Sequence, residues 1–389
     1  MRITFLVDNL PHPTLPLLTE HGLSMYIDQI TPNSSLLTPN SILCDMGASG
    51  AYIKNAKALG IDLSSCNWAF LSHAHADHTG GLGKWIAQYG HIPVYASHHI
   101  PALQCYSSRP KQVASHKSSF GHFFPIGQQH VDKLSDRILL TESTKRLNDS
   151  TTKQQEFDSP IRRLVDSPER SELRYIGTDL NLFHGHTPWF KPIEQNTWLT
   201  PHIALVFPTC SNYPTPLGNK YLYTDELENL RNGDVLMTEG NHRLTPNSSL
   251  LTPNFLSSGT VRKTSTGNGP STRTGTVRDD FSHEIALCFV TPKGLVIVSC
   301  CSHHGALNTI ASCMEFTGCN TLHAYIGGLH FVDSPQVEAE TSSFISDWLT
   351  LYPNAHLYTG HCTCPRAATM LKAHLPYCHT FYTGKVIEV

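Results

Sequence analysis

The sequence predicts a layered α/β fold, and two observations carry that prediction. Short apolar runs rich in β-branched and aromatic residues recur along the 389-residue chain, and amphipathic helical patterns lie between several of them. Hydrophobic residues make up 40% of the chain, which is enough for a sizeable core. Strands mixed with helices pack in layers, because each element has an apolar face to bury. We therefore expect a single α/β domain over residues 1–389.

The individual elements follow from these patterns. In chain order the predicted strands are ITFLV, SILCD, WAFLS, IPVYAS, HIALVF, DVLMTEG, EIALCFV, GLVIVSC, LHAYIGG and HLYTG. Two predicted helices have apolar residues at positions i, i+3, i+4 and i+7: Leu82, Trp85, Ile86 and Tyr89 in one, Leu307, Ile310, Ala311 and Met314 in the other. A third helix is predicted over about residues 337–349, and a fourth over RAATMLKAHL.

Three segments break the alternation of strands and helices. Residues of about 107–200 are polar and weakly periodic, which indicates an insertion or a mobile lid that supplies substrate contacts. Residues of about 241–280 have low complexity and predict a flexible surface loop. The peptide TPNSSLLTPN occurs at residues 31–40 and again at 245–254. Two separate copies do not make a solenoid, so we interpret them as inserted surface peptides.

The composition argues against several classes of protein. The formal net charge is −3 without a long basic block, so we expect no nucleic-acid partner. No apolar run is long enough to span a membrane, and the start, MRITFLVDNL, lacks the pattern of a signal peptide. Twelve cysteines are scattered through a chain too long for a small disulfide scaffold. We therefore expect a cytoplasmic protein with reduced thiols, and leave its oligomeric state open.

The motif His73-Ala-His75-Ala-Asp77-His78 is the strongest chemical signal in the chain. It follows the apolar strand WAFLS and precedes Thr79-Gly80-Gly81, which permits a tight turn into the next helix. His73 and His75 can converge on one metal ion, and Asp77 and His78 can face a second. Imidazole and carboxylate suit Zn²⁺, with Mn²⁺ or Fe²⁺ as alternatives. The competing interpretation is a polar turn with chance histidines, which the strand–loop–helix context disfavours.

Further ligands are expected where other strands end, because one loop cannot complete two metal sites. His303 directly follows the strand GLVIVSC, and His361 follows HLYTG. His330, in IGGLHF, has the same context. A lone histidine at a strand end is more often structural, but several at matching positions favour a shared site.

These motifs together resemble the metallo-β-lactamase superfamily. HAHADH matches its HxHxDH signature, and Asp45-Met-Gly47 resembles its strand-end Asp-x-Gly motif. The resemblance is closer to the branch of 7,8-dihydropterin-6-methyl-4-(β-D-ribofuranosyl)aminobenzene-5′-phosphate synthase-like proteins. It rests on EHGLSMYID, CDMGASGAYIKNAKALGID, LSHAHADHTGGL, SCCSHHGALNTI, YIGGLHF and TGHCTC. It implies a four-layer αβ/βα sandwich with two mixed β-sheets and a metal site at one edge.

The resemblance also implies a ligand set for two Zn²⁺ ions. One ion would be held by His73, His75 and His303, and the other by Asp77, His78 and His361. Asp45 would orient a ligand or the loop by hydrogen bonds, or simply cap the turn that follows.

The chain departs from the superfamily pattern at one ligand. We find no counterpart of the strand-end aspartate that bridges the two ions in many members. Cys301, in SCCSH, occupies a comparable strand end, and Glu239, in LMTEG, is a second candidate beside the site. Cys362 and Cys364, in HCTC, are predicted to be buried or half-buried thiols, with an auxiliary metal or redox pair as the alternative.

The leading functional hypothesis is metal-assisted hydrolysis of a small-molecule ester, lactone, thioester or phosphate-type substrate. Asp77 is the candidate ligand and proton acceptor, and His330 the candidate group that donates to substrate or orients a ligand. A pterin-precursor synthase of the transferase type is the first alternative. Nucleic-acid processing, redox chemistry at a di-iron site and a non-catalytic metal sensor or scaffold are the others.

Overall fold

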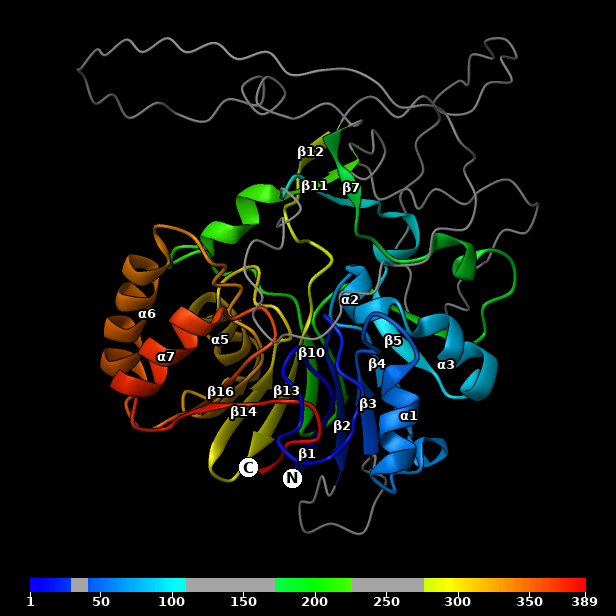
Figure 1. The fold of residues 1–389 in the computed structure, drawn as a ribbon, viewed down its shortest axis with the longest axis horizontal. Helices are drawn as coiled ribbons and strands as arrows, with labels where there is room; N and C mark the ends of the chain where they lie inside the picture. The colour runs from blue at the N-terminus through cyan, green and yellow to red at the C-terminus, as the bar shows by residue number, and fades with distance from the viewer. Residues whose placement is uncertain (29–40, 110–171, 226–275) are drawn as a thin grey trace, which may run out of the picture.

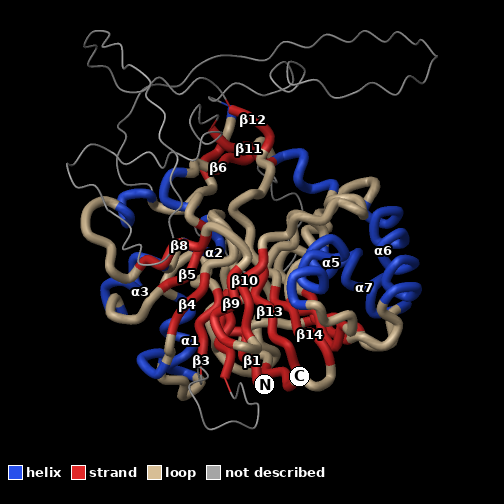
Figure 2. Tube along the Cα trace, turned by 180° about the vertical axis from the view of Figure 1, so that it is seen from behind, coloured by secondary structure: helices blue, strands red, loops and turns tan. Residues whose placement is uncertain are grey.

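A computed structural model describes residues 1–28, 41–109, 172–225 and 276–389. Two seven-stranded mixed β-sheets pack face to face, and helices cover the outer face of each sheet (Figures 1 and 2). This arrangement confirms the predicted four-layer αβ/βα sandwich. Nine of the ten predicted strands lie in the described residues and all nine are present; DVLMTEG lies outside them.

The first sheet contains the N-terminal strands and the last strand of the chain. In spatial order it comprises β18 (Val386–Glu388), β1 (Arg2–Val7), β2 (Ser24–Asp28), β3 (Ser41–Cys44), β4 (Trp68–Phe70), β5 (Val94–Ser97) and β8 (Phe190–Ile193). The pairs from β18 to β3 are antiparallel, and those from β3 to β8 are parallel.

The second sheet repeats this mixed pattern with later parts of the chain. In spatial order it comprises β17 (Cys378–Thr380), β16 (His356–Thr359), β15 (Leu322–Ile326), β14 (Gly294–Val298), β13 (Ala286–Thr291), β10 (Ile203–Val206) and β9 (Thr197–Thr200). The strands from β14 to β17 are parallel, whereas those from β9 to β14 pair antiparallel. Both sheets therefore have a set of parallel strands whose carboxyl ends lie at a common edge.

The central core lies between the two sheets. Phe5 and Ile27 of the first sheet belong to the same buried cluster as Phe289 and Val298 of the second, and all four side chains are at most 3% exposed. Strands that are buried on both faces read as continuous apolar runs, which is why ITFLV and GLVIVSC were recognisable in the sequence.

The two outer cores explain the helix periodicity. α1 (Ala51–Ala58) and α3 (Leu82–Tyr89) bury Tyr52 and Trp85 against the first sheet. α5 (Ala306–Thr317), α6 (Val337–Leu351) and α7 (Pro365–His374) bury Ile310, Trp348 and Leu371 against the second. The four predicted helices are present, and α1 and the four-residue α2 (Ala76–Thr79) are additions. None of the described helices combines the length and the apolar character needed to cross a lipid bilayer.

A third, four-stranded sheet stands over the end of the sandwich, at the top of Figure 1. It comprises β12 (Thr276–Arg278), β11 (Leu222–Asp225), β6 (Cys105–Ser107) and β7 (Arg174–Tyr175), all paired antiparallel. Of the predicted insertion at 107–200, residues 190–200 contribute the edge strands β8 and β9 to the main sheets. Both copies of TPNSSLLTPN and Glu239 lie outside the described residues, and the insertion boundaries remain predictions.

The two glycines after the HAHADH loop are required by close approach. Gly80 and Gly81 have helical φ values of −62° and −81°, so their role is not to supply an unusual backbone conformation. A Cβ atom at Gly80 would lie 2.3 Å from the carbonyl oxygen of Ala48, and one at Gly81 would lie 2.2 Å from that of Met46. These contacts pin the loop that follows β4 against the loop that follows β3.

Candidate metal centre

The candidate site lies where parallel strands of both sheets end. Because the carboxyl ends of parallel strands meet at one edge, residues far apart in the sequence converge there. The strands β3, β4, β14, β15 and β16 are followed, in that order, by Asp45, His73, His303, His330 and His361. All five side chains are at most 6% exposed.

The first predicted ligand set is assembled as a compact group. One ring nitrogen from each of His73, His75 and His303 lies within 4.8 Å of the others. The Nε2 atoms of His73 and His303 are buried and have no hydrogen-bond partner among the described residues. Buried polar atoms without partners cost free energy, and a cation among these nitrogens would remove that cost. The three histidines therefore fit a metal ion.

The second predicted set is also brought together. Oδ2 of Asp77 lies 3.8 Å from Nε2 of His78 and 3.5 Å from Nε2 of His361. The two imidazole Nε2 atoms are 3.0 Å apart. Asp77 and His78 are carried by the short helix α2 (Ala76–Thr79), whereas His361 follows β16. A carboxylate and two imidazoles are typical zinc ligands.

Hydrogen bonds from Asp45 fix the tautomers of two of these histidines. Oδ2 of Asp45 accepts from the Ser72 hydroxyl at 2.6 Å and from Nδ1–H of His78 at 2.7 Å. Since the hydroxyl proton of Ser72 points to Asp45, its oxygen accepts from Nδ1–H of His73 at 2.8 Å. Both rings are thereby left with a lone pair on Nε2, the form that binds a metal.

Two asparagines fix the tautomers of His303 and His361, the histidines that follow strands of the second sheet. Asn219, in the 3₁₀ turn Leu217–Tyr221, donates from Nδ2 to the carbonyl of His303 and accepts from Nδ1–H of that residue at 3.2 Å. Asn9 donates to the carbonyl of His361 and accepts from its Nδ1–H at 3.3 Å. The Nε2 lone pairs of His78 and His361 consequently face each other, an arrangement that repels unless a cation lies between them.

Asp279 lies near His75, but Nε2 of His75 has no hydrogen-bond partner among the described residues. Oδ2 of Asp279 lies 3.7 Å from Nε2 of His75 and 3.3 Å from Nε2 of His283. His283 accepts the backbone N–H of Ala74 at Nδ1, so its remaining proton is on Nε2 and points to Asp279. A metal at Nε2 of His283 would require an imidazolate, and we therefore assign Asp279 and His283 to support of the HAHADH loop. Burial raises the pKa of Asp279, but the two neighbouring histidines outweigh this effect and keep the carboxyl ionised.

Cys301 lies between the two ligand sets. Its Sγ is 3.1 Å from Nε2 of His78 and lies within 4.8 Å of ligand atoms of His73 on one side and of His361 on the other. The thiol thus lies within reach of residues from both predicted ligand sets. Cys362 faces Cys301 and accepts the backbone N–H of His330, whereas Cys364 caps the start of α7 and is not its partner.

Burial keeps the imidazoles of His73, His303 and His330 neutral. It lowers the pKa of His73, His303 and His330 well below 6.5, and neighbouring histidines act in the same direction on His73 and His303. For His330 the second contribution comes from Arg109. Neutral imidazole is the form that coordinates metals, so these shifts prepare the site for cations near neutral pH.

The backbone around the site is strained. Asp45, His330 and His361 have φ values of 55°, 52° and 51°, in the left-handed region that residues other than glycine rarely occupy. Ser302 and Phe281 share this conformation, with φ values of 56° and 55°. All of the positive-φ residues other than glycine in the described chain border the candidate site. Such concentration of strain is typical of functional sites.

Both ring nitrogens of His330 are hydrogen-bonded to protein groups. Its Nδ1–H donates to Oδ1 of Asn219 at 2.9 Å, and its Nε2 accepts from Nη2 of Arg109 at 3.1 Å. The ring packs edge-on against His303, with 4.4 Å between the ring centroids. In this arrangement His330 holds Arg109 beside the metal ligands and has no free proton to give to a substrate.

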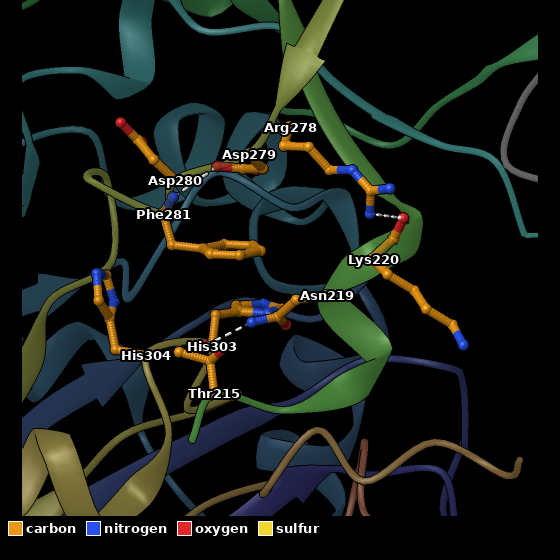
Figure 3. Close-up of a pocket in the computed structure, with 9 residues that line it drawn as sticks. All are labelled: Thr215, Asn219, Lys220, Arg278, Asp279, Asp280, Phe281, His303 and His304. Atoms are coloured by element: carbon orange, nitrogen blue, oxygen red, sulfur yellow. Dashed lines mark hydrogen bonds between the residues drawn. The ribbon is translucent and has the colours of Figure 1, made fainter. Parts of the chain in front are cut away.

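A cavity of about 310 Å³ adjoins the centre at His303 (Figure 3). The ring of Phe281 stacks on that of His303, with an angle of 2° between the planes and 4.4 Å between the centroids. The cavity is lined by Thr215, Asn219, Lys220, Arg278, Asp279, Asp280, Phe281, His303 and His304. It offers a planar surface and both signs of charge to a small molecule.

Comparison with known proteins supports this description. The model of the metallo-β-lactamase superfamily matches residues 33–114, which include the HAHADH loop. The crystal structure of Tm1679, a metal-dependent hydrolase of the β-lactamase superfamily, aligns over 100% of this chain and 99% of its own, with a TM-score of 0.58 and 20% identity. That likeness shows the shared metallo-β-lactamase fold.

A curated relative of this metallo-β-lactamase-fold chain comes from Methanocaldococcus jannaschii. It is named 7,8-dihydropterin-6-methyl-4-(β-D-ribofuranosyl)-aminobenzene-5′-phosphate synthase and is 33% identical over 115 residues. The match covers 29% of this chain and 37% of the relative. Together these matches confirm the resemblance that the sequence motifs indicate.

Several residues at this site were not found from the sequence, and four of them contact the histidines through isolated polar side chains. Asn9, Arg109, Asn219 and Asp279 are single polar residues outside any motif, and each contacts at least one histidine of the site. Asp279 offers a faint signal, because it opens the run DDFSH just before a predicted strand. The other three offer none.

Proposed function

We propose that the protein is a metal-dependent hydrolase that acts on a small molecule. One observation carries the proposal. Each of five buried histidines has one ring nitrogen beside an oxygen atom of the protein, and their other ring nitrogens lie close together. These rings belong to His73, His75, His78, His303 and His361. Outer oxygen partners of this kind are typical of metal-binding histidines.

Divalent ions held in such a centre supply a Lewis acid that polarises a substrate oxygen and lowers the pKa of a coordinated water. The protein itself contributes a carboxylate at the same place. Oδ2 of Asp77 is within 3.8 Å of three imidazoles, those of His21, His78 and His361. We assign Asp77 both to ligation and to acceptance of the proton that leaves the attacking water.

We propose Zn²⁺ as the resident ion, because imidazole, carboxylate and a neighbouring thiol match its preferences. Mn²⁺ or Fe²⁺ would be favoured by more oxygen ligands than the described residues offer. Cys301 can serve as a thiolate ligand shared by both positions, which would replace the aspartate of other superfamily members.

The second candidate function is a synthase reaction on a pterin precursor. Its support is the name of the M. jannaschii relative together with 33% identity over 115 residues. The cavity beside His303 offers the flat ring of Phe281 and the charges of Arg278 and Lys220, features that suit a planar, anionic substrate. Esters, lactones, thioesters and phosphate esters remain the substrate classes of the hydrolase proposal.

Metal content and turnover should be measured on the same samples. Elemental mass spectrometry of the wild type is expected to show about two zinc ions per chain, with fewer in His361→Ala. His374→Ala, an exposed histidine on α7, is the matched control and should retain the wild-type content.

Turnover then separates the candidate functions. Hydrolysis of ester, lactone, thioester or phosphate-ester probes by wild type and His374→Ala, and its loss in His361→Ala, would support the hydrolase. Metal without turnover of these probes, but with conversion of a reduced pterin substrate, would favour the synthase. Metal with neither activity would indicate a sensor or scaffold.

A further inference from the structure

Arg109 is a cation beside the candidate metal centre with no acidic partner among the described residues. It follows β6 in the third sheet, and its side chain is half-buried. Nη2 donates to the carbonyl of Gly218 at 3.4 Å and lies 3.1 Å from Nε2 of His330. The Nε atom is buried and without a hydrogen-bond partner in the described chain. No carboxylate in those residues forms an ion pair with this guanidinium.

Two other arginines of the described chain are paired with carboxylates. Arg2 binds both carboxylate oxygens of Asp28, and Arg366 binds Asp333. A half-buried guanidinium with unused N–H groups costs free energy, and a bound oxyanion would offset that cost. Arginine also presents a planar fork of donors that fits two oxygens of one anion.

The guanidinium faces the metal ligands. Its contact with His330 places it one ring away from His303, since the two imidazole centroids are 4.4 Å apart. Burial lowers the pKa of Arg109, and the negative charges of the nearby Cys362 and Asp77 act in the opposite direction. The cation therefore lies beside the first ligand set, separated from His303 by the ring of His330.

Neighbouring residues hold the side chain in this direction. His330 accepts from Arg109 at Nε2 only because Asn219 takes the proton on the opposite nitrogen. A Cβ atom at Gly218 would lie 3.1 Å from Nη2 of Arg109 and 3.1 Å from Cε1 of His330. Asn219 thus orients His303 and, through His330, also orients Arg109.

We propose that Arg109 binds an oxyanion group of the substrate, a carboxylate or a phosphate, next to the metal centre. This assignment rests on the proposed function, because it concerns the substrate of that same site. In this reading His330 is a positioning residue, and Arg109 is the specificity-determining residue that touches substrate. The substrates then share an anionic group placed within reach of both Arg109 and the metal ligands.

The test is direct binding, without turnover, by isothermal titration of metal-loaded protein with inorganic phosphate and, separately, with succinate. The variants are Arg109→Met, which removes the charge, and Arg109→Lys, which keeps the charge but loses the fork. Arg366→Met is the matched control, because Arg366 pairs with Asp333 on the exposed face of α7. Metal content is measured on every sample.

We expect Arg109→Met to raise the dissociation constant of one of these anions about tenfold or more, and Arg109→Lys to raise it severalfold, with metal content unchanged. Arg366→Met should match the wild type. If Arg109→Met weakens the binding of only one of the two anions, that anion identifies whether a phosphate or a carboxylate is recognised.

Wild-type dissociation constants for both anions in a metal-replete Arg109→Met protein would overturn the proposal. If that variant does not fold, wild-type affinities in Arg109→Lys would overturn it instead. Failure of the hydrolase proposal would show differently, as absent turnover in a wild type that binds metal and anion.

Discussion

Replacement of Asp45 by asparagine should weaken both metal positions although it preserves the shape of the side chain. In the wild type, Oδ1 of Asp45 accepts the backbone N–H of Ser72 at 2.8 Å, while Oδ2 accepts from the Ser72 hydroxyl and from His78. An asparagine must keep its oxygen toward the backbone N–H, because two donors would otherwise face each other. Its amide NH₂ then points to His78 and to the Ser72 hydroxyl.

The protons on both rings would then move. His78 would have to accept at Nδ1 and carry its proton on Nε2, the atom that faces the second ligand set. Ser72 would turn its own proton toward Nδ1 of His73, which would place the proton of that ring on Nε2 as well. Loss of an outer hydrogen-bond partner typically costs 10–100-fold in metal affinity, or about 1.4–2.7 kcal/mol per site.

Chelator competition at neutral pH, with zinc bound to the protein measured at each chelator concentration, gives both affinities. Asp28→Asn is the matched control, because Asp28 pairs with Arg2 on β1 and β2. It should bind zinc as the wild type does. If Asp45→Asn retains two ions with wild-type affinities, the tautomer argument is wrong.

Three further predictions concern stability. Burial raises the pKa of Asp8 to about 6, above the 3.8 of a solvent-exposed aspartate, so ionisation of Asp8 destabilises the folded state as pH rises through that window. The free energy of unfolding of Asp8→Asn, measured by denaturant titration relative to wild type, should therefore rise by about 3 kcal/mol between pH 4 and 7. A difference between the two proteins that does not change with pH would contradict this. Glu284→Gln should lower the free energy of unfolding by about 3 kcal/mol, because Glu284 accepts the backbone N–H groups of both His303 and His304 and the ring N–H of His304. A loss below 1 kcal/mol by the same assay would show that water replaces these bonds. Trp348→Ala should cost about 3–5 kcal/mol in guanidinium unfolding while zinc content stays unchanged, since Trp348 is 2% exposed in the core under α6; loss of zinc would mean that this core and the site are coupled.

The sequence predicts well where its signal is local. Buried strands are continuous apolar runs, and α3 and α5 have a regular apolar stripe, so each could be recognised within its own segment. α1 could not, because its buried face includes Asn55, whose side chain donates to the carbonyls of Leu6 and Leu18. That contact satisfies a buried polar group but leaves no hydrophobic pattern. The edge strands β8 and β9 are only partly buried, and they have no apolar pattern that would have predicted them.

The sequence by itself determined which residue types the candidate centre uses, since the HAHADH loop and the strand-end histidines are contiguous with recognisable strands. Only the tertiary structure decided how each ring is oriented. His75 meets Asp279, and His303 meets Asn219, across more than eighty residues of chain. A single polar residue carries no periodicity, so its partner is fixed only when packing brings the two together. The tautomers that make these imidazoles metal ligands are therefore a property of the fold.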